Sequence, residues 1–274
     1  MLLELKKKEF NLFRELVYDR LGISLNDQKV SMMQSRLSKL VTKKGLKNYM
    51  ELYEYFIHHG GSSVDAELED AITTNVTSFF REKEQWVYFK EYIKNSVLRK
   101  EKKKLRIWSS ASSSGEEPYS IAIFLHENIP NIETWDIKIL ATDISEDILK
   151  KAMQGVYSQK SMEGLSPNLI KKYFNLRKNA MAKEFTVNDS IKKMITFRKY
   201  NLVYGNYGMF RNPIDIIFCR NVMIYFDKTV QTQINMHLTK LIQNGGLLFI
   251  GHSESIPPSV KNLKLVKSSI YMKQ

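Results

Sequence analysis

Apolar residues recur at helical spacing through roughly the first 75 residues of the chain. Two sets of them each share one helical face: Leu12, Leu16 and Val17, and then Val30, Met33, Leu37, Leu40 and Val41. A third helix is expected over about 48–57. The pattern therefore predicts an all-helical N-terminal domain over residues 1–75.

The pattern changes to alternating strands and helices after about residue 100. Apolar runs at 105–110, 136–143, 214–219 and 247–252 predict strands, and helical patterns follow the first three of them. Such alternation predicts an α/β domain over residues 76–274, with a mostly parallel sheet and helices on both faces. The tail LKLVKSSIYMK is expected to add a last, antiparallel strand.

Residues 155–200 interrupt the strand–helix alternation. Short strand candidates within them, EFTVN and MITFRKY, predict a small β-rich insertion in the α/β domain.

Composition narrows the class of partner. The chain has 274 residues, a net charge of +13 and one cysteine, Cys219. A single cysteine fits a reducing cytoplasm, and the sequence contains no apolar run long enough to cross a membrane. The positive charge is concentrated between Gln28 and Met50 and again over 150–200. A basic protein of this kind suits an acidic partner, which leaves nucleic acid, a membrane surface and an acidic protein open.

The loop SSASSSGEEP, residues 109–118, joins the first predicted strand to a helix, and Asp143 ends the second strand. A small-residue loop followed by a strand-ending acid suits the ribose of an adenosine ligand, although Asp143 could instead cap the next helix. Glycine signatures for dinucleotides and triphosphates are absent from the sequence. Glu116 and Glu117 would repel a pyrophosphate and attract a cation such as a sulfonium, which favours S-adenosylmethionine (SAM).

Polar residues in two other segments are candidates for the same site. NVTSFFRE contains Asn75, Thr77 and Arg81, and Arg81 can pair with a small carboxylate or remain a surface charge. The strand at 214–219 ends in Cys219, Arg220 and Asn221, with Tyr225 close by. We expect Cys219 to be a small buried residue, because no base is placed to activate it.

Histidines give weaker signals. His252 and Glu254 form either an acid–base pair or a structural strand end, and we favour the structural role. The pair His58-His59 has no cysteine or carboxylate at ligand spacing, so no metal site is predicted.

These motifs, in this order, resemble the chemotaxis receptor methyltransferase family, CheR, over nearly the whole chain. The resemblance rests on NVTSFFRE, WSSASSSGEEPYSIAI, ATDISEDILKKAMQGVYS, FRKYNL, IDIIFCRNVMIYFD and GGLLFIGHSES. It implies a helical receptor-recognition domain, a Rossmann-like SAM-dependent methyltransferase domain and a small antiparallel β-subdomain at about 155–200. The serine-rich loop departs from the family, whose loops often contain more alanine and cysteine, but its residues remain small.

The resemblance also implies roles for particular residues. Those that would bind the cofactor are Asn75, Thr77, Arg81, Glu117, Asp143, Asn201, Leu202, Arg220 and Asn221. Arg81 and Tyr225 would act in catalysis by positioning rather than by proton transfer. The product would be S-adenosylhomocysteine.

The implied activity is methylation of glutamate side chains on acidic cytoplasmic helices of methyl-accepting chemotaxis receptors. Arg36, Lys39 and Lys43 share a helical face and would contact these helices. A nucleic-acid partner is not expected, because the Asn212-Pro213 site precedes a strand instead of ending one. We expect a cytoplasmic monomer without membrane insertion, and a signalling module that binds SAM without methylating anything remains the alternative.

Overall fold

The computed structural model describes residues 3–59, 62–178 and 183–274. The chain divides into two compact units, which are described separately. The first comprises residues up to Thr74 together with Tyr225–Val230, and the second comprises Asn75–Ile224 and Gln231–Gln274. Residues 179–182, which belong to the predicted β-subdomain, lie outside the described part of the chain. No helix within the described ranges is long and apolar enough to cross a bilayer.

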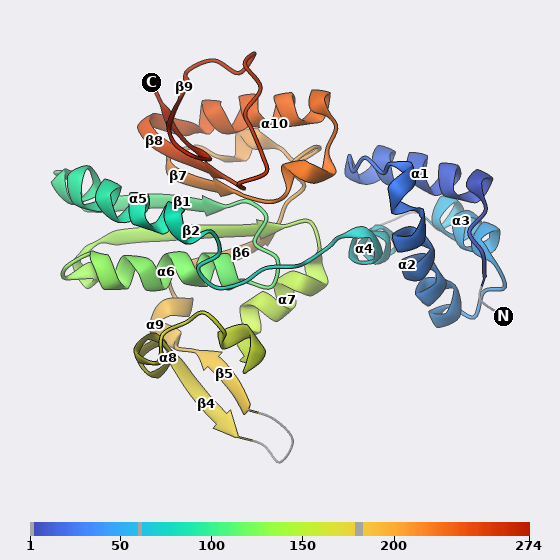
Figure 1. Ribbon diagram of the computed structural model, residues 1–274, viewed down its shortest axis with the longest axis horizontal. Coiled ribbons are helices and arrows are strands. Elements are labelled where there is room, and N and C mark those ends of the chain that lie inside the picture. Colours follow the sequence, from blue (N-terminus) through green and yellow to red (C-terminus); the bar gives the residue numbers. More distant parts are fainter. Residues whose placement is uncertain (1–2, 60–61, 179–182) are drawn as a thin grey trace. The chain divides into compact units, whose positions relative to one another are not determined.

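Helices make up the first unit, as the apolar spacing predicts (Figure 1). They are α1 (Lys7–Leu21), α2 (Val30–Lys43), α3 (Tyr49–His58) and α4 (Ser62–Ile72), with the short 3₁₀ turn η1 (Asp27–Lys29) before α2. Their apolar faces bury Phe13, Leu37, Leu52 and Phe56 completely. Asn48 begins α3 by accepting a hydrogen bond from the backbone N–H of Glu51, at 2.9 Å, which satisfies an otherwise unpaired donor.

The second unit is built on a sheet that, in the described residues, has seven strands in the order β6-β2-β1-β7-β8-β10-β9. These strands are β1 (Lys104–Ser109), β2 (Asp136–Asp143), β6 (Ile195–Lys199), β7 (Ile214–Cys219), β8 (Ile242–Ile250), β9 (Leu263–Lys267) and β10 (Ile270–Lys273). The first five in the spatial order pair in parallel, and β10 runs antiparallel to both β8 and β9. The predicted α/β class and the antiparallel tail are thus confirmed.

Helices and short turns connect these strands. The helices are α5 (Lys83–Asn95), α6 (Glu116–Asn128), α7 (Glu146–Gln154), α8 (Pro167–Tyr173), α9 (Asp189–Lys192) and α10 (Lys228–Leu241). The 3₁₀ turns are η2 (Val97–Arg99), η3 (Ile132–Thr134), η4 (Lys160–Met162), η5 (Tyr207–Met209) and η6 (Met223–Tyr225).

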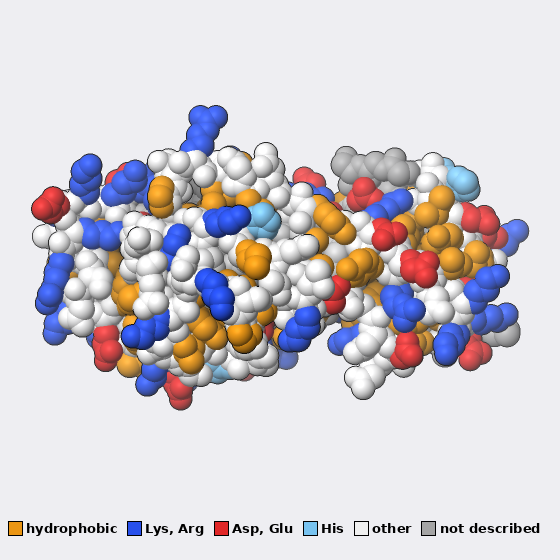
Figure 2. Space-filling view, turned by 90° about the horizontal axis from the view of Figure 1, so that it is seen from above, with side chains coloured by type: hydrophobic (Ala, Val, Ile, Leu, Met, Phe, Trp, Pro, Cys, Tyr) orange, Lys and Arg blue, Asp and Glu red, His pale blue; other side chains and the backbone are white. Residues whose placement is uncertain are grey.

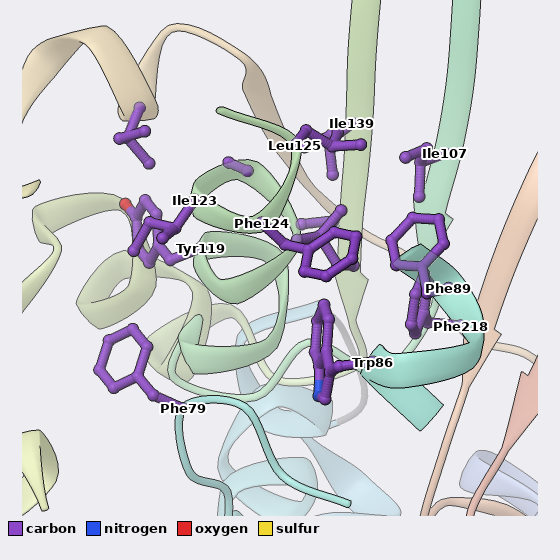
Figure 3. Close-up of a cluster of buried hydrophobic side chains, with 14 of the residues drawn as sticks. Phe79, Trp86, Phe89, Ile107, Tyr119, Ile123, Phe124, Leu125, Ile139 and Phe218 are labelled. Carbon is purple, nitrogen blue, oxygen red and sulfur yellow. The ribbon is translucent and has the colours of Figure 1, made fainter. Parts of the chain in front are cut away.

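Aromatic side chains join α5 and α6 to the sheet (Figure 3). Phe89 of α5 stacks on Phe124 of α6 with ring centroids 4.7 Å apart, and Phe218 of β7 stacks on Phe249 of β8 at 4.4 Å. Every residue of β7 is buried, as expected for a central parallel strand that is covered on both faces. This rigid core fixes the carboxyl ends of the strands.

A second, antiparallel sheet has the order β3-β5-β4 among the described residues, with β3 (Val156–Ser158), β4 (Phe174–Lys178) and β5 (Lys183–Val187). It contains the predicted strand EFTVN. The assignment of MITFRKY to this insertion is wrong, because Ile195–Lys199 pair in parallel with Ile139–Asp143 of β2. The strand extends the large sheet and covers an edge that β2 would otherwise expose.

Candidate functional site

The parallel strands β1, β2, β7 and β8 all end at the same edge of the large sheet, where ligands bind in open α/β folds. From β1 the sheet grows in one direction through β2 and β6 and in the other through β7 and β8, so the strand order reverses between β1 and β7. These two parallel strands are neighbours in the sheet although more than 100 positions separate them in the sequence. Most of the sequence-predicted cofactor residues lie in the loops that follow these strands or beside them.

Backbone hydrogen bonds hold the small-residue loop after β1. The N–H of Ser110 donates to the Phe218 carbonyl at 2.9 Å, and the N–H of Ser112 donates to the Thr142 carbonyl at 2.8 Å. Gly115 has a φ of +97°, and a Cβ at this position would lie 2.9 Å from the Tyr157 hydroxyl. Glycine is therefore required here by both the backbone conformation and the available space.

Asp143, at the end of β2, is tied to this loop. Its carboxylate accepts hydrogen bonds from the N–H of Ser113, at 2.8 Å, and from the N–H of Ser145, at 3.1 Å. The N-cap of α7 is Ser145, whose hydroxyl accepts from the N–H of Ile148. Asp143 therefore does not cap α7, and its carboxylate instead joins the ends of β1 and β2.

The two acids of the loop differ in their partners. Glu116 is buried and accepts a hydrogen bond from the Ser114 hydroxyl at 2.6 Å. Glu117 accepts from the Ser109 hydroxyl at 2.7 Å and from Nη1 of Arg220 at 3.1 Å. Burial raises the pKa of both carboxyl groups, and Arg220 opposes this rise at Glu117. Glu117 is thus one half of an ion pair.

Arg220, which directly follows β7, lies at the centre of the site with its side chain 2% exposed. Its guanidinium contacts Glu117 and also Glu82, whose Oε2 lies 3.0 Å from Nη2. Nη2 donates to the backbone carbonyl of Arg81 at 2.7 Å. The cluster Glu82–Arg220–Glu117 contains two carboxylates and one guanidinium, so with both acids ionised its formal charge is −1.

Asn221 adopts a left-handed conformation, with φ of +57°, and two acids hold it. Its N–H donates to Glu254 at 2.9 Å, and its side-chain amide donates to Glu82 at 3.3 Å. Glu254 also accepts from the N–H groups of Met223, at 2.8 Å, and Gly251, at 2.6 Å. A carboxylate occupied by backbone donors agrees with the structural role favoured for Glu254, and the His252 ring lies 3.9 Å from Glu82 instead.

The segment NVTSFFRE brings three of the predicted residues to this edge. The Asn75 carbonyl accepts a hydrogen bond from the Ser113 hydroxyl at 3.3 Å, which links it to the loop. Thr77 is half-buried. Arg81 directs Nη1 to the Val76 carbonyl at 3.0 Å, so its side chain folds back over its own loop.

Asn201 and Leu202 follow β6, next to Asp143. The N–H of Tyr200 donates to the Asp143 carbonyl at 2.9 Å, which places this loop beside the end of β2. The side chain of Asn201 accepts from the N–H groups of Val203 and Tyr204, and thereby shapes the turn. Leu202 is buried.

Cys219 is fully buried at the end of β7. Burial raises the pKa of its thiol far above the usual range. The thiol stays protonated at neutral pH, so it is a poor nucleophile, in agreement with the small buried residue that the sequence predicts.

Four predicted residues belong to the helical unit and not to this cluster. The Tyr225 hydroxyl lies 3.5 Å from the Thr74 carbonyl, and the Tyr225 carbonyl accepts from the N–H of Ser24 at 2.8 Å. Arg36 donates to the carbonyls of residues 71–73 and to the Thr74 hydroxyl, so its guanidinium closes the C-terminal end of α4. Lys39 and Lys43 are exposed on α2.

Sequence reasoning missed Glu82 entirely. It lies directly after Arg81 in NVTSFFRE, and only the pairing with Arg220, which is 138 positions away in the sequence, reveals its place in the site. The motif provided a weak signal, since it ends in an acid next to a basic residue.

The sheet, the loop after β1 and the acid that ends β2 together define a Rossmann-like methyltransferase domain. The CheR methyltransferase SAM-binding domain matches residues 75–272, and the CheR all-alpha domain matches residues 8–73. The chain therefore belongs to the CheR methyltransferase family, and SAM is its cofactor.

Curated relatives agree with this family. A probable chemotaxis protein methyltransferase of Rhizobium etli is 37% identical over 250 residues, which cover 90% of this chain and 92% of the relative. The chemotaxis protein methyltransferase of Borreliella burgdorferi is 36% identical over 276 residues, which cover 99% of this chain and 96% of the relative. The chemotaxis protein methyltransferase of Escherichia coli is 33% identical over 273 residues, which cover 98% of this chain and 92% of the relative.

The residues present fit SAM in charge and in hydrogen bonding. The formal charge of −1 on Glu82–Arg220–Glu117 is complementary to a cationic ligand. Within the described residues, the buried hydroxyl oxygen of Ser112 has no hydrogen-bond partner, although it lies in the loop that the sequence assigns to the cofactor. Buried polar groups are rarely left unpaired, so a ligand group is a natural partner for this hydroxyl.

Proposed function

We propose that this chain methylates glutamate side chains of chemotaxis receptors and so forms glutamate methyl esters. The observation that carries the proposal is the cluster Glu82–Arg220–Glu117, in which two carboxyl groups share one guanidinium and are therefore already paired. SAM supplies an electrophilic methyl group on a positively charged sulfur. A glutamate is ionised at neutral pH, so it can accept a methyl group without first losing a proton to the enzyme.

The roles of the protein side chains then follow from their surroundings. Glu117 and Glu254 already accept hydrogen bonds from the protein, and neither is needed as a base. Arg81 spends one N–H on the Val76 carbonyl and has others with which to bind a carboxylate. We assign the cofactor contacts to Asn75, Thr77, Arg81, Glu117, Asp143, Asn201, Leu202, Arg220 and Asn221, and positioning in catalysis to Arg81 and Tyr225.

The receptor as partner is supported by charge. Lys and Arg side chains are spread over the face of the molecule shown in Figure 2, in keeping with the net charge of +13. Lys39 and Lys43 are exposed on α2, whereas Arg36 is engaged by the end of α4. We therefore place the contact with acidic cytoplasmic receptor helices on Lys39 and Lys43, with Arg36 supporting the domain from within.

A labelling experiment tests the proposed activity. The full chain is incubated with methyl-labelled SAM and membranes that contain chemotaxis receptors, and we expect base-labile label on a receptor-sized protein. Arg81→Ala should lower the rate of methyl transfer by at least about tenfold, because it removes a charged hydrogen-bonding group. The control Lys83→Ala removes an exposed charge two residues along and should leave this rate unchanged. Base-stable label, or cofactor binding without transfer, would contradict the proposal, and the latter result would favour the signalling module.

Charge reversal tests the receptor contact. Lys39→Glu with Lys43→Glu should slow methylation of intact receptor by about three- to tenfold at low salt and less at high salt, because exposed charges are screened. Cofactor affinity should stay unchanged. The control Lys7→Glu with Lys8→Glu makes the same charge change on exposed residues of α1, and an equal loss in both double variants would place the contact elsewhere.

A further inference from the structure

Glu82 is a half-buried acid that lies between three segments of the site. Its side chain is 10% exposed, and it stands at the N-terminal end of α5 without capping that helix. Oε2 accepts from Nε of Arg220 at 3.3 Å and lies 3.0 Å from Nη2. Oε1 accepts from the Asn221 amide at 3.3 Å and from the N–H of His252 at 3.1 Å. One carboxylate thus joins the start of α5 to the loops after β7 and β8.

The backbone around Glu82 is strained in a way that supports a functional role. Phe80 and Glu82 have φ of +51° and +60°, a conformation that costs free energy for residues with a side chain. The Arg81 carbonyl between them accepts from Nη2 of Arg220 at 2.7 Å and from the Trp86 indole at 3.0 Å. The strained turn therefore directs a carbonyl and a carboxylate at the same guanidinium.

These contacts constrain the side chains of Arg220 and Asn221, the two residues that directly follow β7. Glu117 holds Arg220 through Nη1, and Glu82 holds it through Nε and Nη2, so the guanidinium plane is fixed from two sides. A carboxylate only accepts hydrogen bonds, so the NH₂ group of the Asn221 amide must face Glu82. The Oδ1 atom of Asn221 therefore points away from Glu82. Without Glu82, both side chains would gain rotational freedom.

We propose that Glu82 is a positioning residue for cofactor binding, which fixes Arg220 and Asn221 in the orientation that the cofactor requires and acts through them. This inference rests on the cofactor-binding roles proposed above for Arg220 and Asn221. It gives the acid of NVTSFFRE a function distinct from that of Arg81, since Glu82 acts through its contacts with Arg220 and Asn221.

A double-mutant cycle tests whether Glu82 acts through Arg220. The affinity of the full chain for labelled S-adenosylhomocysteine is measured by equilibrium dialysis for the wild type, Glu82→Gln, Arg220→Met and the double variant. We expect Glu82→Gln to weaken binding by at least about tenfold in the wild type and by less than about twofold in the Arg220→Met background, because coupled residues are not additive. The product lacks the sulfonium charge, so the measurement reports geometry more than electrostatic attraction.

Controls separate this role from general stability. Glu84→Gln removes the same charge two residues along, at an exposed position of α5, and should leave product affinity unchanged. All measurements are made well below the thermal unfolding midpoint of each variant, and Glu82→Asp replaces Glu82→Gln if the latter does not fold. The proposal would be overturned if Glu82→Gln weakened product binding by the same factor in the wild type and in the Arg220→Met variant. It would also be overturned if Glu82→Gln bound the product as tightly as Glu84→Gln does.

The acceptor of the methyl group does not enter the cycle. If receptors are not labelled but the cycle shows coupling, the proposed substrate is wrong and the role of Glu82 stands. If receptors are labelled and the cycle is additive, only the inference about Glu82 fails.

Discussion

Asp215, near the amino end of β7, and Arg220, just beyond its carboxyl end, are both buried charged residues with different surroundings. Asp215 accepts from the Lys100 ammonium, from the N–H of Arg106 at 2.6 Å and from the Gln243 amide at 2.6 Å. One anion there meets one cation, and the remaining donors are neutral. Arg220 is instead shared by Glu82 and Glu117, so two carboxyl groups at the carboxyl end have one cation between them.

The difference shows how one strand can serve stability and function separately. A charge pair that is complete within the protein is costly to break and leaves no uncompensated charge for a ligand. A cluster with an uncompensated charge costs stability when empty and gains it when a cation arrives. Both ends are built from buried charges, but only the carboxyl end is arranged for an additional partner.

The largest effect should come from Arg220→Met, which leaves two carboxylates facing each other in the interior. We expect a loss of about 3–5 kcal/mol in the free energy of unfolding at pH 8. Urea unfolding followed by tryptophan fluorescence measures it, because the three tryptophans, Trp86, Trp108 and Trp135, all lie in the SAM-binding unit. If Arg220→Met lost less free energy of unfolding than Asp215→Ala does, the proposed difference between the two ends of β7 would be wrong.

The pH dependence of this variant provides a second measurement. In the wild type, burial tends to raise the pKa of Glu82, but Arg220 and the His252 N–H lower it below the ordinary value of 4.5. That carboxylate therefore adds stability above pH 4.5, and this contribution is lost as the pH falls through its lowered pKa. Without Arg220, burial raises the pKa of Glu82 as well as that of Glu117, so the sign reverses. The destabilisation by Arg220→Met should be larger at pH 8 than at pH 5.

Asp215→Ala should have the next largest effect, on stability alone. It leaves the Lys100 ammonium and two neutral donors unpaired, which should cost about 2–4 kcal/mol in the free energy of unfolding. Affinity for S-adenosylhomocysteine should change by less than about twofold, because the cluster at the carboxyl end is untouched. Asp136→Ala is the control, since its pair with Arg106 is at the surface and its loss should leave the free energy of unfolding close to that of the wild type.

Ser112→Ala should produce the smallest effect, with opposite signs for folding and binding. Removal of a buried hydroxyl without a partner should leave the free energy of unfolding unchanged or raise it by up to about 1 kcal/mol. Affinity for S-adenosylhomocysteine should fall by about three- to tenfold, the effect of one lost hydrogen bond. Ser110→Ala is the matched control, because the Ser110 hydroxyl donates to the Phe218 carbonyl at 3.1 Å and its loss should destabilise the fold. Unchanged affinity in Ser112→Ala would remove the hydroxyl from the cofactor site.

Much of the fold could be predicted because it follows from local patterns. The apolar run IDIIFC predicts the central strand β7 with the same bounds as in the structure, and DIKILATD does the same for β2. MITFRKY was assigned to the wrong sheet, because the residues of an edge strand specify that it is extended but not which neighbour it will pair with. Strand order depends on contacts between distant segments, which periodicity does not contain.

The sequence by itself determined the family, the α/β class and the residue types of the site, because small residues after β1 and an acid after β2 meet local requirements of a nucleoside ligand. Only the tertiary structure decided how the charges combine. It pairs Glu117 with Arg220, adds Glu82 to the cluster and engages Arg36 at the end of α4. Charge compensation is a property of atoms a few ångströms apart in space, and these partners are separated by 35 to 138 positions in the chain.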